Sequence, residues 1–193
     1  AASMDDSLTI IDVSNPSYPV FTASIRGSGP PNYLNGINSV FISCNYAFVT
    51  ASFDDSLTII NIANPSQPAF ASSIHGASLP NYLNGASDVV MASGYAYVTA
   101  QYDDSLVVVN VQDRSTPKLW GLIKGAGPPN YLNGASHVSV KGNYAYVSSY
   151  LDHSFSTFDI SKPSSPQLTK VIRGPGASYY LSGTRSNCIA FKE

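Results

Sequence analysis

The chain repeats itself every 49 residues. The polar segment GPPNYLNG at 29–36 recurs at 127–134, a near copy SLPNYLNG lies at 78–85, and a more divergent copy GASYYLSG lies at 176–183. The glycines that close these segments are evenly spaced and no insertion interrupts the period: Gly36, Gly85, Gly134 and Gly183. A fixed period of about 40–50 residues is typical of proteins built from one supersecondary unit used several times. The 193 residues therefore form one repeat domain, 1–193, with repeat boundaries near these glycines.

Each unit is predicted to hold four short strands. The first is an apolar strand A, exemplified by 86–93. The second is a strand B of alternating aromatic and small residues, exemplified by 46–53 in the preceding unit. An Asp-Asp-Ser turn leads to a β-branched strand C (57–63), and a Pro-rich turn leads to strand D (69–74). Helical periodicity is absent throughout.

Repeated four-stranded units predict a β-propeller, because one sheet buries both of its faces only when neighbours pack against it. We expect an all-β, four-bladed β-propeller with four antiparallel strands per blade. The chain begins in the second half of a B strand, near 1–4, and ends with an A strand, SNCIAF, at 186–191. We expect the C-terminal A strand to join the N-terminal strands and close the ring, which would remove an exposed sheet edge. The incomplete B strand leaves imperfect closure, missing residues or a neighbouring chain as alternatives.

The strand C segments resemble a known repeat family. LTIIDVSNPSYP (8–19) and LTIINIANPSQP (57–68) are similar to LVIVD repeats, and so is YAYVTA (95–100) followed by DDSLVVVNV (103–111). The resemblance covers essentially the whole chain, with a departure at Asp113-Arg114, a weaker strand at 155–163, and a longer PNYLNG loop. The resemblance implies a propeller fold and an envelope, surface or secreted setting, but it does not imply an enzyme activity, which a fold alone never does.

Composition excludes several classes of partner. Only 11% of the residues are charged, against roughly 25% in an average protein, and the net charge is −2. No basic field exists to hold a phosphate backbone, so we expect no nucleic acid partner. No apolar run approaches the ~20 residues that span a bilayer, so we expect no membrane insertion. An opening AAS would suit a mature end left by signal cleavage, consistent with a secreted or cell-surface protein.

The PNYLNG loops and the acidic turns are expected to share one rim of the propeller. Tyrosines offer flat apolar surface with a polar tip, and asparagines offer donors and acceptors, as sugars do. The candidate ligand-binding residues are Tyr33, Asn35, Tyr82, Asn84, Tyr131, Asn133, Tyr180, Asp6, Asp55, Asp104, Arg26, His75, Lys124 and Arg173. The alternative interpretation is structural: Asn-Gly is turn chemistry, Leu34 and its copies point inward, and each base lies beside the acidic turn of its own blade.

The paired aspartates also raise calcium as a cofactor. Asp5-Asp6 and its copies supply hard oxygen ligands, but the spacing is not that of an EF-hand, and the fourth copy reads Asp152-His153. A plain β-turn is the favoured interpretation, so we expect no cofactor.

One repeat position in the A strands is occupied in successive units by Ser39, Asp88, His137 and Ser186. Asp88, His137 and Ser186 are the three residue types of a hydrolase triad. A triad requires hydrogen-bond contact, whereas neighbouring inner strands are expected to stand well apart, so we expect no catalytic residues and no enzyme.

Cys44 and Cys188 stand at A-strand phases in units that would be neighbours in a four-blade ring. A disulfide across the closure is conceivable, and two buried free thiols are the favoured interpretation.

The sequence thus predicts a non-enzymatic, extracellular or surface module that works by binding or adhesion, with a multivalent loop face for a glycan or protein ligand. The alternative is a structural subunit that self-assembles into a homo-oligomer or filament by strand completion between chains.

Overall fold

The computed structural model describes residues 2–174 and contains fourteen strands in that range. The strands are β1 (Ser7–Asp12), β2 (Val20–Arg26), β3 (Ile37–Ser43), β4 (Tyr46–Ala51), β5 (Ser56–Asn61), β6 (Ala69–His75), β7 (Ala86–Ala92), β8 (Tyr95–Ala100), β9 (Ser105–Asn110), β10 (Lys118–Lys124), β11 (Ala135–Lys141), β12 (Tyr144–Ser149), β13 (Ser154–Asp159) and β14 (Gln167–Arg173). The described residues form no helix, so none could cross a membrane as a helix.

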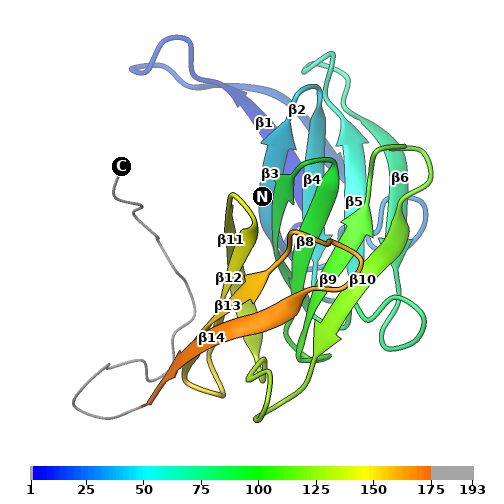
Figure 1. Ribbon diagram of the computed structural model, residues 1–193. Coiled ribbons are helices and arrows are strands. Elements are labelled where there is room, and N and C mark those ends of the chain that lie inside the picture. The colour runs from blue at the N-terminus through cyan, green and yellow to red at the C-terminus, as the bar shows by residue number, and fades with distance from the viewer. Residues whose placement is uncertain (1, 175–193) are drawn as a thin grey trace.

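The strands form four antiparallel sheets, which follow one another along the chain. Sheet 1 pairs β1 with β2; sheet 2 has the order β3-β4-β5-β6, sheet 3 the order β7-β8-β9-β10, and sheet 4 the order β11-β12-β13-β14. Figure 1 shows the chain passing from sheet 1 in blue, through sheets 2 and 3, to sheet 4 in yellow and orange. The predicted A-B-C-D meander is confirmed in sheets 2, 3 and 4.

The sheets pack face to face, so the middle sheets are buried on both sides. β5 and β9 are each buried at their first five residues, as their near-continuous apolar and β-branched sequences require. Three apolar clusters fill the spaces between successive sheets; Ile60 belongs to the cluster with sheet 1 and Ile59 to the cluster with sheet 3. The inner strand β7 contacts both β3 and β11, which sets the A strands side by side.

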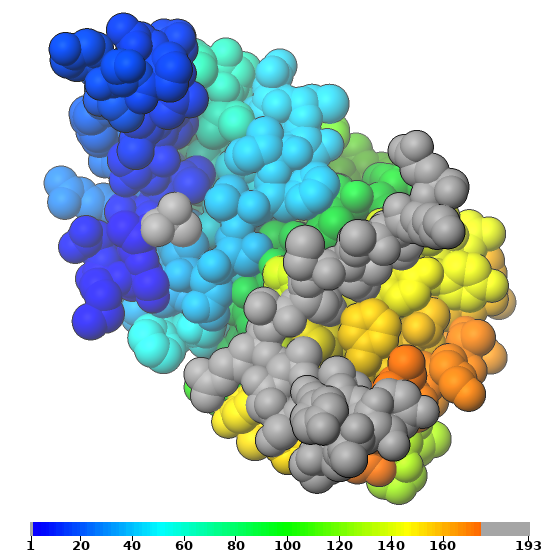
Figure 2. All heavy atoms as spheres, turned by 90° about the vertical axis from the view of Figure 1, so that its left-hand side faces the viewer, coloured from blue at the N-terminus to red at the C-terminus, as the bar shows by residue number. Residues whose placement is uncertain are grey.

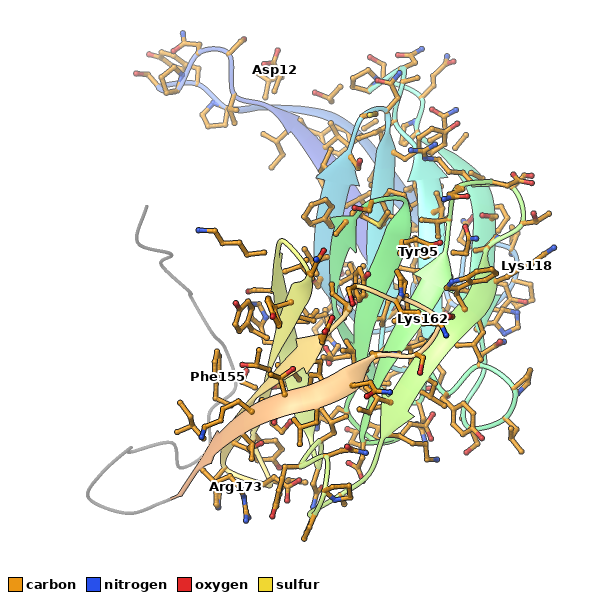
Figure 3. The ribbon with its side chains drawn as sticks, viewed as in Figure 1. Asp12, Tyr95, Lys118, Phe155, Lys162 and Arg173 are labelled. Carbon is orange, nitrogen blue, oxygen red and sulfur yellow. The ribbon has the colours of Figure 1, made fainter. Side chains whose placement is uncertain are left out.

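Sheet 1 and sheet 4 each keep one face less covered. Ile11 of β1 is 53% exposed, although its repeat counterparts Ile60, Val109 and Phe158 are fully buried. In β13 the buried residues alternate with half-buried ones, and Phe155 lies on the half-buried side. Figure 2 shows blue residues of sheet 1 and orange residues of sheet 4 on opposite sides of one face of the molecule, and Figure 3 shows Phe155 on sheet 4. These are the two faces that would meet if the four units closed a ring.

The two predictions about the chain ends have different outcomes. Ala2 forms an isolated bridge with Ser7, the counterpart of the Ala51–Ser56 pair between β4 and β5, and 3–6 form a turn. The expected half B strand near 1–4 is therefore reduced to this single bridge. The predicted A strand at 186–191 lies outside the described residues, and so do Gly183, Ser186 and Cys188.

Candidate functional site: the loop face

The PNYLNG loops (27–36, 76–85 and 125–134) and the acidic turns lie at the same end of the sheets, as the sequence predicts. Side-chain hydrogen bonds from the turns to the loops establish this directly. We call this end the loop face. Figure 3 shows Arg173, at the end of β14, at this end and Asp12 at the opposite end of the molecule.

The first aspartate of each acidic turn holds the loop that enters its own sheet. Asp54 Oδ2 accepts hydrogen bonds from the backbone N–H groups of Gly29 (2.9 Å) and Asn35 (2.8 Å). Asp103 and Asp152 accept the corresponding pairs in the next two loops, at 2.9–3.0 Å. A carboxylate that accepts two N–H groups fixes the loop, because either donor would otherwise lack a partner when partly buried.

The second aspartate reaches the following loop. Asp6, Asp55 and Asp104 each accept one hydrogen bond at Oδ1, from the N–H groups of Gly36, Gly85 and Gly134 respectively, at 2.9–3.0 Å. The acidic turns therefore connect successive loops by hydrogen bonds to the backbone. Residues 2–174 contain no group of three His, Cys, Asp or Glu side chains placed to hold a metal ion.

The glycine that receives this bond is required by geometry. Gly85 has φ +69°, and a Cβ at that position would lie 2.5 Å from Cδ2 of Tyr102. Only glycine tolerates both the left-handed backbone and the close approach of the ring. The repeat of glycine at the end of each loop is therefore explained by backbone conformation and by the ring packed against it.

Each loop tyrosine stacks on the basic residue at the end of the outer strand of the sheet that its loop enters. Tyr33 and His75 have ring centroids 4.1 Å apart with an interplanar angle of 19°. The Lys124 ammonium lies 4.4 Å from the Tyr82 ring centroid, and the Arg173 guanidinium lies 4.1 Å from that of Tyr131. Such cation–π contacts contribute about 0.5–1 kcal/mol at exposed sites.

The bases stand beside the acidic turns, as predicted, since His75 pairs with Ser56 in the β5–β6 register. They form no ion pair with those turns within residues 2–174, the part of the chain that the structure describes. The carboxylates point at backbone N–H groups instead, and the bases lie over the tyrosine rings. Arg26 is exposed at the matching position of β2, and Tyr180 lies outside the described residues.

The two asparagines of each loop have different environments. The first is structural: Asn32, Asn81 and Asn130 donate from Nδ2 to the carbonyl oxygens of Arg26, His75 and Lys124, each at 2.8 Å. The second, Asn35, Asn84 or Asn133, is half-buried, and its side-chain amide has no hydrogen bond to any residue between 2 and 174. Between the two lies Leu34, Leu83 or Leu132, which is fully buried, as predicted.

The inner strands approach one another more closely than the sequence led us to expect. Ser39 Oγ donates to Asp88 Oδ1 at 2.6 Å, and His137 Nδ1 lies 2.7 Å from Asp88 Oδ2, which also accepts the N–H of Val138 at 3.0 Å. The expectation that side chains at this phase stand well apart is therefore wrong. Asp88 is only 6% exposed, so the network is a buried hydrogen-bonded contact that joins three sheets.

A small pocket lies at the start of these inner strands, on the loop face. It has a volume of about 240 Å³ and is lined by Asn38, Ser87, Gln101, Ser136 and Tyr150. Asn38, Ser87 and Ser136 are repeat counterparts at β-bulges, where the pairing of the A strand with the B strand shifts by one residue. Sequence reasoning missed this pocket, although the divergence of Ser52, Gln101 and Tyr150 within otherwise well-copied repeats could have indicated it.

Cys44 is not buried, contrary to prediction. It is a free, exposed cysteine in the turn between β3 and β4, with φ +52°. The prediction placed Cys44 within the A strand, but that strand, β3, ends one residue earlier, at Ser43.

The repeats and the sheet arrangement define an all-β, propeller-like repeat protein. The LVIVD repeat family model matches residues 2–26, 37–75, 85–124 and 134–172, so the chain belongs to the LVIVD repeat family and the resemblance seen in the sequence is confirmed. No curated protein matches the chain.

Solved structures share the fold at low identity. A Lactobacillus plantarum protein is 16% identical with a TM-score of 0.72, over 90% of this chain and 53% of its own. A putative 6-phosphogluconolactonase from Bacteroides fragilis is 11% identical with a TM-score of 0.66, over 87% of this chain and 49% of its own. The computationally designed Ika4 protein is 14% identical with a TM-score of 0.59, over 86% of this chain and 84% of its own. The chain thus spans about half the length of the two natural proteins.

Proposed function

We propose that this protein is a non-enzymatic, secreted or surface-attached binding module that engages a glycan or a protein ligand through its loop face. The observation that carries the proposal is the repetition of one rigid arrangement. Three loops present the same half-buried tyrosine, backed by a base, and the same asparagine with an amide that bonds no described residue. Weak contacts repeated on one rigid body gain avidity without any new contact.

A glycan array tests this proposal. The parent protein is compared with a variant in which Tyr33, Tyr82 and Tyr131 are changed to Ala, and folding of each is checked by circular dichroism. The matched control changes Tyr18 and Tyr144 to Ala; both tyrosines are exposed, and both lie at the opposite end of the sheets. Binding that is lost in the loop variant and kept in the control supports the proposal, and equal binding by all three proteins refutes it.

We also propose that the four units close into a four-bladed propeller. The support is complementary: the half-buried side of sheet 4 around Phe155 and the exposed side of sheet 1 around Ile11 are the repeat counterparts of faces that meet between the other sheets. In a closed ring, the repeat register places Arg26 on Tyr180, as Arg173 lies on Tyr131.

A double-mutant cycle on Arg26 and Tyr180 tests ring closure, with the cycle on Arg173 and Tyr131 as an internal reference of identical chemistry. Closure predicts a coupling energy in the first cycle equal to that in the second, about 0.5–1 kcal/mol. A coupling near zero in the first cycle alone would contradict closure.

Self-assembly is the second candidate function, favoured by the exposed apolar residues of sheet 1. Ile11, Val20 and Phe21 are 53%, 59% and 64% exposed, and no described strand pairs with the inner edge of β1. A second copy that added a strand to this edge and packed its sheet on this face would bury Ile11 and Phe21, which lie opposite each other in the β1–β2 register. Light scattering at increasing concentration separates the two candidates: a defined oligomer or polymer favours assembly, and a monomer at high concentration contradicts it.

No catalytic residue is part of the proposal. Ser186, the serine of the triad pattern, lies outside the described residues, and Ser39 donates its hydrogen bond to Asp88, so it is not paired with His137 as a nucleophile would be. Turnover of generic esters by the parent protein that is abolished by His137→Ala would overturn the non-enzymatic assignment.

A further inference from the structure

The pocket at the start of the inner strands differs from the rest of the loop face in one respect. The loops are near copies of one another, whereas one of the repeat positions at the pocket holds a different residue in each unit. Ser52, Gln101 and Tyr150 occupy one repeat position, and Gln101 and Tyr150 line the pocket while Ser52 does not. A pocket built from diverged copies is asymmetric, and an asymmetric pocket holds a single small ligand in one orientation.

We propose that this axial pocket binds one neutral saccharide unit. The pocket is lined by amide and hydroxyl groups, with no charged side chain among the described residues that line it. Amides and hydroxyls both donate and accept hydrogen bonds, and so do the hydroxyls of a sugar. The inference rests on the proposed binding function and assigns it a second, distinct site.

The free hydrogen-bonding groups of the pocket can be identified from the bonds already made. Ser87 Oγ lies within hydrogen-bond distance of Thr99 Oγ1 and the carbonyl oxygens of Thr99 and Ala135, so it serves to join sheets 3 and 4. Gln101, in contrast, bonds through its backbone N–H to Gly85 O at 3.0 Å, and its side-chain amide bonds no residue in the described range. Gln101 therefore offers a donor and an acceptor on a fixed backbone.

Tyr150 supplies the apolar contact. Its backbone N–H donates to Gly134 O at 3.1 Å, and its ring lies against Gly134, where a Cβ would come within 2.9 Å of Cδ1. An aromatic ring beside an amide matches a sugar, which has an apolar C–H face as well as hydroxyls. The volume of about 240 Å³ is below the roughly 300–1,000 Å³ of pockets for drug-sized ligands, so it suits one sugar ring rather than an oligosaccharide.

The network one residue further along each inner strand keeps the pocket preformed. Ser39, Asp88 and His137 tie β3, β7 and β11 together through one nearly buried carboxylate. Because these strands carry Asn38, Ser87 and Ser136 at the preceding position, the spacing of the pocket walls is fixed before a ligand arrives. Preorganisation of this kind reduces the entropic cost of binding a small ligand.

Ligand-detected NMR with a panel of neutral monosaccharides tests the proposal on the full chain. We expect saturation transfer to at least one sugar, and Gln101→Ala should weaken its binding roughly 10-fold, the loss expected from removing one or two hydrogen bonds. Gln67→Ala is the matched control, because Gln67 is exposed in the turn between β5 and β6, away from the pocket. It should bind the sugar as the parent does.

The outcomes separate this inference from the proposed function. The axial pocket is overturned if a sugar binds the parent and Gln101→Ala equally. It is also overturned if no monosaccharide binds although the glycan array is positive. Neither result affects the proposed binding by the loop tyrosines. Monosaccharide binding that is lost in Gln101→Ala supports the axial pocket. Glycan-array binding that is unchanged in the tyrosine variant refutes the role of the loop tyrosines. A folded parent that binds no saccharide in either assay overturns both the axial pocket and glycan recognition by the loop tyrosines.

Discussion

Removing the carboxylate of Asp103 should destabilise the protein although the residue is only half-buried. Asp103 Oδ2 accepts the N–H groups of Ser78 at 3.0 Å and Asn84 at 2.9 Å, and both belong to the loop that enters sheet 3. Hydrogen bonds to a charged group are worth roughly 1.5–3 kcal/mol each, and partial exposure reduces that value. We expect Asp103→Ala to lower the free energy of unfolding by about 2–4 kcal/mol.

Thermal and urea unfolding followed by circular dichroism measure this loss. For a chain of this size about 1 kcal/mol corresponds to roughly 2–4 °C, so the midpoint should fall by about 5–15 °C. Asp103→Asn keeps an acceptor oxygen without the charge and should lose about half as much.

Asp12→Ala is the control for this experiment. Asp12 accepts the N–H of Ser14 at 2.8 Å within an exposed local turn, and this bond holds the pKa of Asp12 below its ordinary value. Its removal should leave the unfolding midpoint at that of the parent, because the carboxylate is exposed and its bond is local. If Asp103→Ala unfolds with the same midpoint as the parent and Asp12→Ala, the carboxylate does not hold the loop, and the structural interpretation of the acidic turns fails.

Three further perturbations have defined outcomes. Gly121→Ala places a Cβ against the carbonyl oxygen of Pro163 in the next sheet, so it should cost about 1–3 kcal/mol in urea unfolding, and no loss would show that the two sheets do not touch there. Asp88→Ala leaves three hydrogen-bond donors of the inner strands without their acceptor, so it should lower the free energy of unfolding by about 3–5 kcal/mol. A change below about 1 kcal/mol would contradict the network. Burial, with a smaller contribution from Tyr95, raises the pKa of Tyr97 from 10.0 to about 12. The folded state thus favours the neutral phenol, and the resulting stability, complete below pH 10, should be lost between pH 10 and 12. Tyr97→Phe should show a smaller decline over that window, and an equal decline would refute the shift.

Much of the fold could be predicted because its determinants are local and repeated. Alternating residues such as those of 46–51 specify a strand, and Asp-Asp-Ser specifies a turn from its own backbone chemistry. The 49-residue period then places every such element four times, which is why the strand order within a unit and the inward direction of Leu34 were predicted correctly. The shared end of loops and acidic turns follows from strand order alone.

The candidate site was harder to predict because its contacts join residues of different units. Nothing near Asp55 in the sequence indicates that its carboxylate accepts the N–H of Gly85, 30 residues away, or that Tyr33 meets His75. Both contacts depend on where a loop crosses the end of the sheet that it enters. The tyrosines, asparagines and bases were correctly grouped at one end, but which groups bond each other there was decided by the packing of the sheets.

The sequence by itself determined the repeat, the strands and turns of each unit and the family, since these depend on period, residue pattern and turn chemistry. Only the tertiary structure decided which polar groups are already satisfied. It assigned the aspartates to backbone N–H groups, joined Ser39, Asp88 and His137 across three sheets, and opened a pocket at Gln101 and Tyr150. The physical reason is that a hydrogen bond requires two atoms to lie about 3 Å apart in space. For residues of different units, that separation is set by the distance between the sheets, a quantity that no local sequence pattern encodes.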